Sequence, residues 1–210
     1  MLFNSLQFLI FFPIVVSIFF LLPQKSRWIL LLIASYYFYM CWKVEYIVLI
    51  ITSTLVDYFV AQKMAALKEK VKRKKWLLIS LFANLGILFG FKYFNFVNAN
   101  VQAIFDQFNV FYGVQAFDVL LPVGISFYTF QTLTYSIDVY RGIHKPLKNP
   151  MQYLVYIMLF AQMIAGPIVR FHQIADQIED RKARETLDNK LLGLFRFGIG
   201  LAKKVLIANV

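Results

Sequence analysis

Residues 121–142 read LPVGISFYTFQTLTYSIDVYRG, an apolar stretch of membrane-spanning length that also carries many polar side chains. Polar groups in hydrocarbon are costly unless they face protein or water. We therefore predict that the helix formed by this stretch turns its polar face toward a protein cavity, as the lining of a pathway or a reaction chamber. The polar side chains are those of Ser126, Thr129, Gln131, Thr132, Thr134, Ser136 and Asp138.

The composition extends this prediction to the whole chain. Of its 210 residues, 60% are hydrophobic and only 16% are charged, whereas soluble domains have roughly 45–50% apolar and about 25% charged residues. We predict an all-α, polytopic integral membrane protein that forms a single membrane domain over residues 1–210, with about six or seven membrane segments. The apolar segments are 3–22, 28–42, 44–60, 76–91, 119–139, 151–169 and 191–210.

The distribution of basic residues predicts the orientation. Residues 61–75 hold seven of the 22 Lys and Arg residues, and only Glu69 opposes them. The positive-inside rule places this loop in the cytoplasm, and therefore places the N-terminus and residues 93–117 outside. Because the basic run lies between two apolar segments, we interpret it as an anchor facing anionic lipid and not as a nucleic-acid site.

The segment 151–169 is predicted to be broken or re-entrant. If it crossed the membrane, the basic residues that follow it would lie outside, and Gly166-Pro167 interrupts a helix near its end.

Two further segments have an amphipathic pattern. Residues 93–109 are expected to form an interfacial helix on the outer face, and residues 172–190 a charged helix with the pairs Arg181–Glu185 and Arg184–Asp188.

Few residues suggest chemistry directly. His144 and His172 have surroundings typical of surface or interfacial side chains, and no group with metal-ligand spacing accompanies them. Asp57 lies near a predicted helix end and is expected to face the lipid headgroups. Asp138 and Arg141 have the spacing of a local ion pair. This pair would either fix a helix end or line the entrance for a substrate at the cytoplasmic end of the helix.

Three stretches, in this order, resemble signatures of the membrane-bound O-acyltransferases, in particular the alginate O-acetylation branch. The first is the stretch 121–142. The second, residues 160–170, reads FAQMIAGPIVR, and the third, residues 193–208, reads GLFRFGIGLAKKVLIA. The resemblance covers essentially the whole chain.

The resemblance implies a multi-pass protein of the bacterial inner membrane that moves acetyl groups from a cytoplasmic donor to an extracytoplasmic, alginate-like polysaccharide. The donor would be acetyl-CoA or a carrier-bound acetyl group, and a partner protein on the outer side would assist. The family's catalytic histidine would lie beyond residue 210, so that the chain corresponds to an N-terminal half that transfers no acetyl group by itself. No catalytic residue is assigned. The predicted chamber or tunnel lining is Ser126, Gln131, Thr134, Asp138, Arg141 and Arg170.

The alternative is a small polytopic transporter or channel-like protein. Such a protein would show similarly interrupted helices in two halves of the chain. The sequence shows no such symmetry, which favours the acyltransferase hypothesis.

Overall fold

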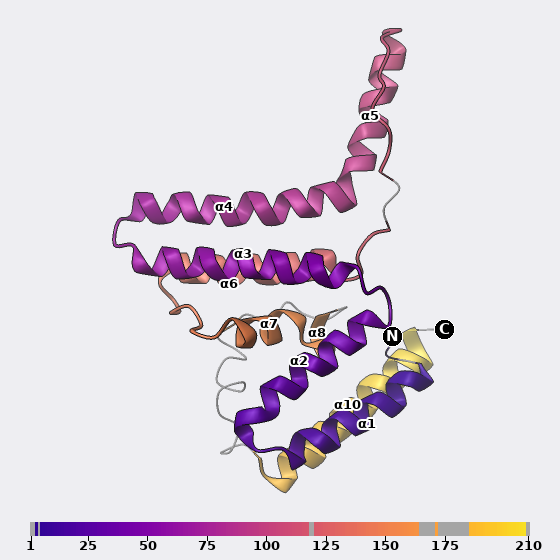
Figure 1. The fold of residues 1–210 in the computed structure, drawn as a ribbon. Coiled ribbons are helices and arrows are strands. Elements are labelled where there is room, and N and C mark those ends of the chain that lie inside the picture. Colours follow the sequence, from indigo (N-terminus) through magenta and orange to yellow (C-terminus); the bar gives the residue numbers. More distant parts are fainter. Residues whose placement is uncertain (1–2, 4, 118–119, 164–170, 172–184, 209–210) are drawn as a thin grey trace.

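The computed structural model describes the chain except for residues 1–2, 4, 118–119, 164–170, 172–184 and 209–210 (Figure 1). The described residues form helices and connecting loops without strands, which confirms the predicted all-α class. In chain order the elements are α1 (Leu6–Leu21), α2 (Gln24–Met40), α3 (Tyr46–Ala66), α4 (Lys70–Leu88), a π-helical turn η1 (Phe89–Tyr93), α5 (Phe94–Gln107), α6 (Ile125–Arg141), α7 (Pro150–Met158), α8 (Phe160–Met163), α10 (Leu187–Lys203) and a π-helical turn η3 (Lys204–Ala208).

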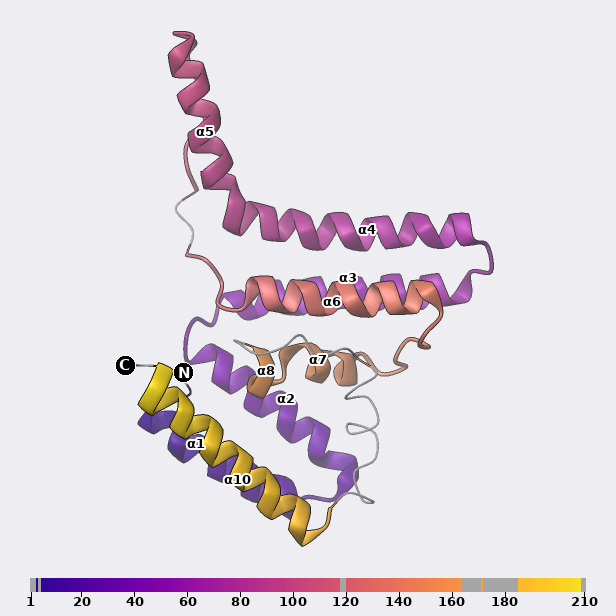
Figure 2. The same ribbon diagram turned by 180° about the vertical axis from the view of Figure 1, so that it is seen from behind.

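The centre of the molecule is a group of three helices, α3, α4 and α6, which lie side by side and pack against one another (Figures 1 and 2). The connection between α3 and α4 is only residues 67–69, so these two helices are antiparallel neighbours. The short helices α7 and α8 lie between this group and α2, and α2 in turn packs against α1.

Two described helices are long and apolar enough to cross a membrane. One is α3, with 21 residues and a length of about 30 Å. The other is the continuous helix of 38 residues that runs from Lys70 to Gln107. The apolar helix α1 is shorter, at 16 residues. These helices support a membrane location, while the number of six or seven membrane segments stays a prediction.

The helix from Lys70 to Gln107 corrects the expected division at residue 92. Segments 76–91 and 93–109 were predicted as separate helices, yet the π-helical turn η1 joins α4 to α5 without a loop. At this turn α5 bends away from the axis of α4 (Figures 1 and 2). A π-helical turn adds one residue to a helical turn and is a known cause of such bends.

Part of the polar face of α5 forms hydrogen bonds with the segment that follows it. Asn95 exchanges two hydrogen bonds of 2.8 Å with the backbone of Phe117. Asn98 is buried, donates to the carbonyl of Val114 at 3.2 Å and accepts from the hydroxyl of Tyr112 at 2.6 Å. These hydrogen bonds therefore hold the chain that follows α5 against α5 itself. The interfacial position of α5 stays a prediction.

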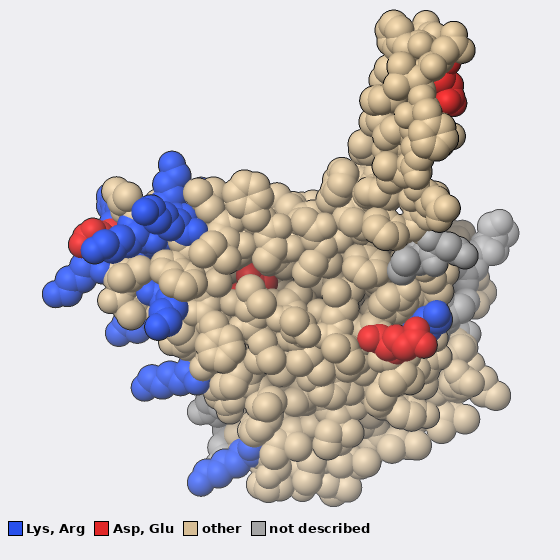
Figure 3. Space-filling model, turned by 45° about the horizontal axis from the view of Figure 1, so that its top comes forward, with Lys and Arg blue, Asp and Glu red and all other residues tan. Residues whose placement is uncertain are grey.

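Basic residues gather at one end of the central helices. Figure 3 shows Lys and Arg side chains clustered where α3 turns into α4, while most of the remaining surface in this view carries no charge. The loop after α6 lies at the same end. The hydroxyl of Tyr58 donates to the carbonyl of Lys148 at 2.7 Å, and the amide of Gln62 donates to the carbonyl of Leu147 at 2.6 Å. This arrangement agrees with placing both loops on one side of a membrane.

The segment that begins with α7 starts and ends at this basic end. The helix breaks at Leu159, between α7 and α8. Further along the chain, the ring of Phe171 lies 5.8 Å from that of His144, which follows α6 closely. Phe171 therefore lies near the end from which α7 starts, while the re-entrant course of 151–169 stays a prediction. The predicted break at Gly166-Pro167 lies outside the described residues.

The last described helix pairs with the first. The rings of Phe12 and Phe197 stack at 4.4 Å, and Lys190 lies 4.4 Å from the ring centre of Phe20, so α1 and α10 run antiparallel (Figures 1 and 2). Since α10 begins at Leu187, the residues just before 191 belong to this helix and not to a separate charged one.

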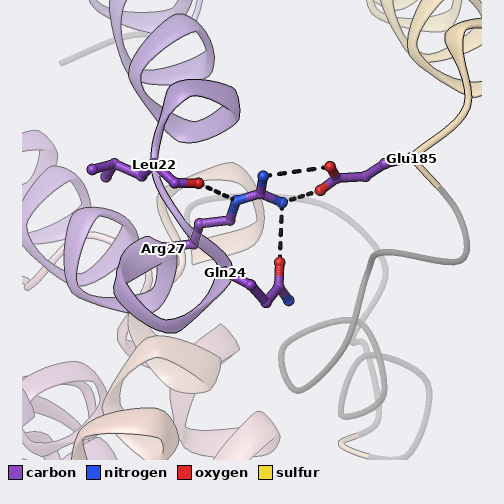
Figure 4. A network of polar contacts seen from close by, with 4 residues as sticks. All are labelled: Leu22, Gln24, Arg27 and Glu185. Atoms are coloured by element: carbon purple, nitrogen blue, oxygen red, sulfur yellow. Dashed lines mark hydrogen bonds and ion pairs between the residues drawn. The ribbon is translucent and has the colours of Figure 1, made fainter.

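The two ion pairs predicted for the charged helix involve Arg181 and Arg184, which lie outside the described residues. Glu185 forms an ion pair with Arg27 of α2 (Figure 4).

The arrangement predicts opposite accessibility for the two ends of the helix from Lys70 to Gln107. In a variant whose exposed Cys41 is replaced by alanine, we expect Lys70→Cys to resist a membrane-impermeant thiol reagent in intact spheroplasts and Asn100→Cys to react. After lysis, both positions should react. Labelling of position 70 but not 100 in intact spheroplasts would show that the orientation is inverted.

Candidate functional site: the buried polar groups of α6

Two glycines with left-handed backbone begin and end α6. Gly124 precedes the helix with φ 77°, and Gly142 follows it with φ 78°. Gly142 donates to the carbonyl of Val139 at 3.1 Å, and Ile143 donates to that of Asp138 at 3.0 Å. These bonds form a Schellman motif, in which the left-handed residue is most often glycine because a Cβ atom would be strained there.

Arg73 of α4 completes the C-terminal end of α6. Its guanidinium donates to the carbonyls of Val139 and Tyr140 at 2.8 and 2.6 Å. A cation at this position also stabilises the negative end of the helix dipole. The two contacts fix α6 relative to α4.

Asp57 of α3 is the centre of a buried polar cluster between the three central helices. The amide nitrogen of Asn84 donates to its two carboxylate oxygens at 2.9 and 2.7 Å, and the hydroxyl of Ser80 donates to Oδ1. From α6, the hydroxyl of Thr132 lies 3.2 Å from Oδ1 of Asn84, and the hydroxyl of Ser136 lies 3.2 Å from that of Ser80. We call these five residues the Asp57 cluster.

The expectation that Asp57 faces the headgroups was wrong. Its side chain is fully buried, with 0% of its surface exposed. It lies well inside α3, which continues for nine residues beyond it to Ala66. Burial of a carboxylate is costly unless donors surround it. Within the described part of the chain, hydrogen bonds and not an ion pair meet this requirement.

A second polar centre holds the break between α7 and α8. The backbone at Leu159 leaves the helical conformation, with ψ 113°. The carbonyl of Tyr156 accepts from the side chains of Gln131 and Gln162 at 2.8 and 2.9 Å. In an unbroken helix the amide of Phe160 would donate to this carbonyl. Here it donates to the hydroxyl of Ser35 at 3.1 Å. Side chains from α2, α6 and α8 thus satisfy the groups that the break exposes.

The remaining predicted lining residues are distributed unevenly. Ser126 is half-buried and accepts from Lys92 at 3.1 Å, and Thr134 is half-buried and donates to the carbonyl of Gln131 at 2.8 Å. Asp138 is buried, whereas Arg141 is exposed. Arg170 lies outside the described residues. The polar face of α6 is therefore largely buried against protein, and its role as a chamber lining stays a prediction.

Five hydroxyls in the same interior are buried without a hydrogen-bond partner among the described residues. They come from α2, α3, α6 and α7, which surround the two polar centres. Buried hydroxyls are normally paired, so that unpaired ones indicate where water or a polar ligand is accommodated. The hydroxyls are those of Tyr39, Thr54, Tyr128, Thr129 and Tyr153.

His144 is not one of the residues of the Asp57 cluster or of the break at Leu159. His144 is half-buried against Phe171 near the basic end, and His172 lies outside the described residues. Within the described ranges, no group of three or more His, Cys, Asp and Glu side chains has the geometry to hold a metal ion.

The chain is similar to curated proteins that acetylate polysaccharides. It is 39% identical, over all of its length, to the probable alginate O-acetylase AlgI of Pseudomonas putida, and 36% identical to that of Pseudomonas aeruginosa. The predicted resemblance to the alginate O-acetylation branch is confirmed. A peptidoglycan O-acetyltransferase of Helicobacter pylori is 33% identical over 85% of this chain.

The chain spans only part of these alginate O-acetylase relatives. It covers 43% of the Pseudomonas putida protein and 40% of the Pseudomonas aeruginosa protein, and 38% of the peptidoglycan O-acetyltransferase. No protein-family profile matches the chain, and no solved structure matches it.

The break between α7 and α8 predicts unequal costs for two substitutions. Ser35→Ala leaves the buried amide of Phe160 without an acceptor and should lower the free energy of unfolding by about 1–3 kcal/mol. Gln131→Leu should cost less, about 0.5–1.5 kcal/mol, because Gln162 still donates to the carbonyl of Tyr156. Equilibrium unfolding in detergent micelles measures both. The matched control is Ser17→Ala, at an exposed position of α1, which should change the free energy of unfolding little. An equal or larger loss for Gln131→Leu than for Ser35→Ala would contradict this assignment.

Proposed function

We propose that the protein containing this chain transfers acetyl groups to hydroxyls of an extracytoplasmic polysaccharide of the alginate type, and that this chain builds part of the reaction chamber. The observation that carries the proposal is the similarity of the whole chain to alginate O-acetylases. The further similarity to a peptidoglycan O-acetyltransferase supports a polysaccharide acceptor as the shared substrate class.

The described interior supports a role in handling a polar substrate. A membrane helix with a buried polar face is expensive to maintain, and such residues are typical of functional sites. Part of the polar face of α6 is committed to the Asp57 cluster and to the break at Leu159. The five hydroxyls that have no partner among the described residues are the groups that we expect to bind the substrate, and Tyr128 of α6 is one of them.

The donor, the partner and the lining are parts of the same proposal. Acetyl-CoA or a carrier-bound acetyl group would enter from the basic, cytoplasmic end, near Asp138 and Arg141, and an extracytoplasmic protein would receive the acetyl group for delivery. Transfer to a hydroxyl needs a base that accepts its proton. No described residue of this chain is assigned that role, and Ser126, Gln131, Thr134 and Arg170 are proposed only as lining.

The proposal predicts that removing a single hydroxyl impairs acetylation without impairing folding. Tyr128→Phe should lower the O-acetyl content of exopolysaccharide about fivefold or more, because one hydrogen bond to the substrate is worth about 1 kcal/mol. It should leave the unfolding free energy unchanged or raised, since its hydroxyl has no partner among the described residues. The complete gene in which this sequence lies would be expressed in cells that lack their own polysaccharide acetylase.

Exposed Tyr37 provides the matched control, and Tyr37→Phe should leave acetylation unchanged. If the wild-type gene restores no acetylation but confers uptake or leakage of a small solute, the transporter alternative is correct. If the wild type restores acetylation and Tyr128→Phe does so equally well, Tyr128 does not face the substrate.

A further inference from the structure

A cleft of about 720 Å³ lies between α1, α2, the break at Leu159 and α10. Its walls are mostly apolar, with Phe12 and Phe20 on α1 and Phe197 on α10. Two cationic residues of α10, Lys190 and Arg196, also line it. The helices α1 and α10 lie across α2 from the three central helices (Figure 1), so the cleft is separate from the Asp57 cluster and adjoins the interior only at the break at Leu159.

The cleft has an excess of positive charge. Glu185 is the one carboxylate among its described lining residues, and it forms an ion pair with Arg27, which also donates to Leu22 and Gln24 (Figure 4). The ammonium of Lys190 lies over the ring of Phe20 at 4.4 Å. Among the described residues, neither Lys190 nor Arg196 forms an ion pair.

The two cations lie at different heights along the cleft. Lys190 lies in the first turn of α10, over the ring of Phe20, and the stacked rings of Phe12 and Phe197 lie about 10 Å farther along the same helix pair. Arg196 directly precedes Phe197, and its long side chain can extend toward a charged group. The cleft therefore has one cation and aromatic surface near each end of this stretch.

We propose that this cleft binds an anionic phospholipid, with its phosphate between Lys190 and Arg196 and an acyl chain along Phe12 and Phe197. The charge complementarity carries the proposal: Lys190 and Arg196 are exposed cations that line a mostly apolar cleft without an ion-pair partner among the described residues, and an anionic headgroup is attracted to such cations. The cleft is open beside Gly193, since this residue lines it and a Cβ atom there would meet nothing within 4 Å. The site does not depend on acetyl transfer.

Native mass spectrometry of the purified protein in a neutral detergent tests the proposal, with dioleoyl phosphatidylglycerol, dioleoyl phosphatidylcholine and inorganic phosphate as separate probes. We expect the wild type to retain phosphatidylglycerol and neither of the other two. Lys190→Gln and Arg196→Gln should each weaken phosphatidylglycerol binding about fivefold, which corresponds to about 1 kcal/mol per cation. Gly193→Leu should weaken it as well, because the larger side chain occupies the space of the acyl chain while both cations remain.

Lys203 of α10 does not line the cleft, and Lys203→Gln is therefore the control that should bind as the wild type does. Thermal unfolding without added lipid identifies any variant that fails to fold. Equal retention of phosphatidylcholine, binding of inorganic phosphate alone, or an equal loss in Lys203→Gln would each overturn the proposal. The proposal would also be overturned if phosphatidylglycerol binding were undiminished in all three cleft variants, each shown to be folded: Gly193→Leu, Lys190→Gln and Arg196→Gln.

Discussion

The hydrogen bonds between Asn84 and the buried carboxylate of Asp57 are the interaction on which the central packing depends. They join α3 to α4 where the carboxylate is fully buried, so that hydrogen bonds from neighbouring side chains must stabilise it. Ser136 and Thr132 extend the cluster to α6. Each hydrogen bond to a charged group contributes about 1.5–3 kcal/mol when its loss leaves that group unpaired. A shift of any one helix along its axis would break several of these bonds, so the cluster fixes how the three helices are aligned.

The same constraint explains the irregular parts of the fold. Where the helix breaks at Leu159, the side chains of Gln131 and Ser35 satisfy the exposed backbone groups. Where the chain returns along α5, Asn95 and Asn98 hold its backbone. In each place, the side chain of a polar residue in an otherwise apolar helix forms a hydrogen bond with a backbone group of another segment. Polar residues in these helices therefore serve structure as well as any later chemistry.

The sequence predicted the all-α class, the polar character of α6 and the basic end, because these follow from hydropathy and charge along the chain. It did not predict the partners of Asp57, since Ser80 and Asn84 contact it only through tertiary packing. Their spacing of four residues on one apolar helix was the available signal. The continuous helix through η1 was also missed, because a π-helical turn has no clear pattern in a single sequence.

The site could be predicted only in part, for a related reason. Gln131 and Asp138 are buried as expected, but Arg141 is exposed and Ser126 is held by Lys92. Hydropathy shows that a polar residue is unusual, and it does not show whether a backbone group, another side chain or a substrate is its partner. Tyr128 was not singled out, since a tyrosine in an apolar segment gives no sequence signal that its hydroxyl is unpaired.

The most direct test of this account is a double-mutant cycle between Asp57→Ala and Asn84→Ala, measured as the free energy of unfolding in detergent micelles. The account predicts a coupling of about 2 kcal/mol, because each single substitution removes two hydrogen bonds from a partner that stays buried, while the double substitution removes both groups. The double variant should therefore be clearly more stable than the sum of the single losses implies. Losses that add to within about 0.5 kcal/mol would show that the two side chains act independently and that the Asp57 cluster does not hold the central helices together.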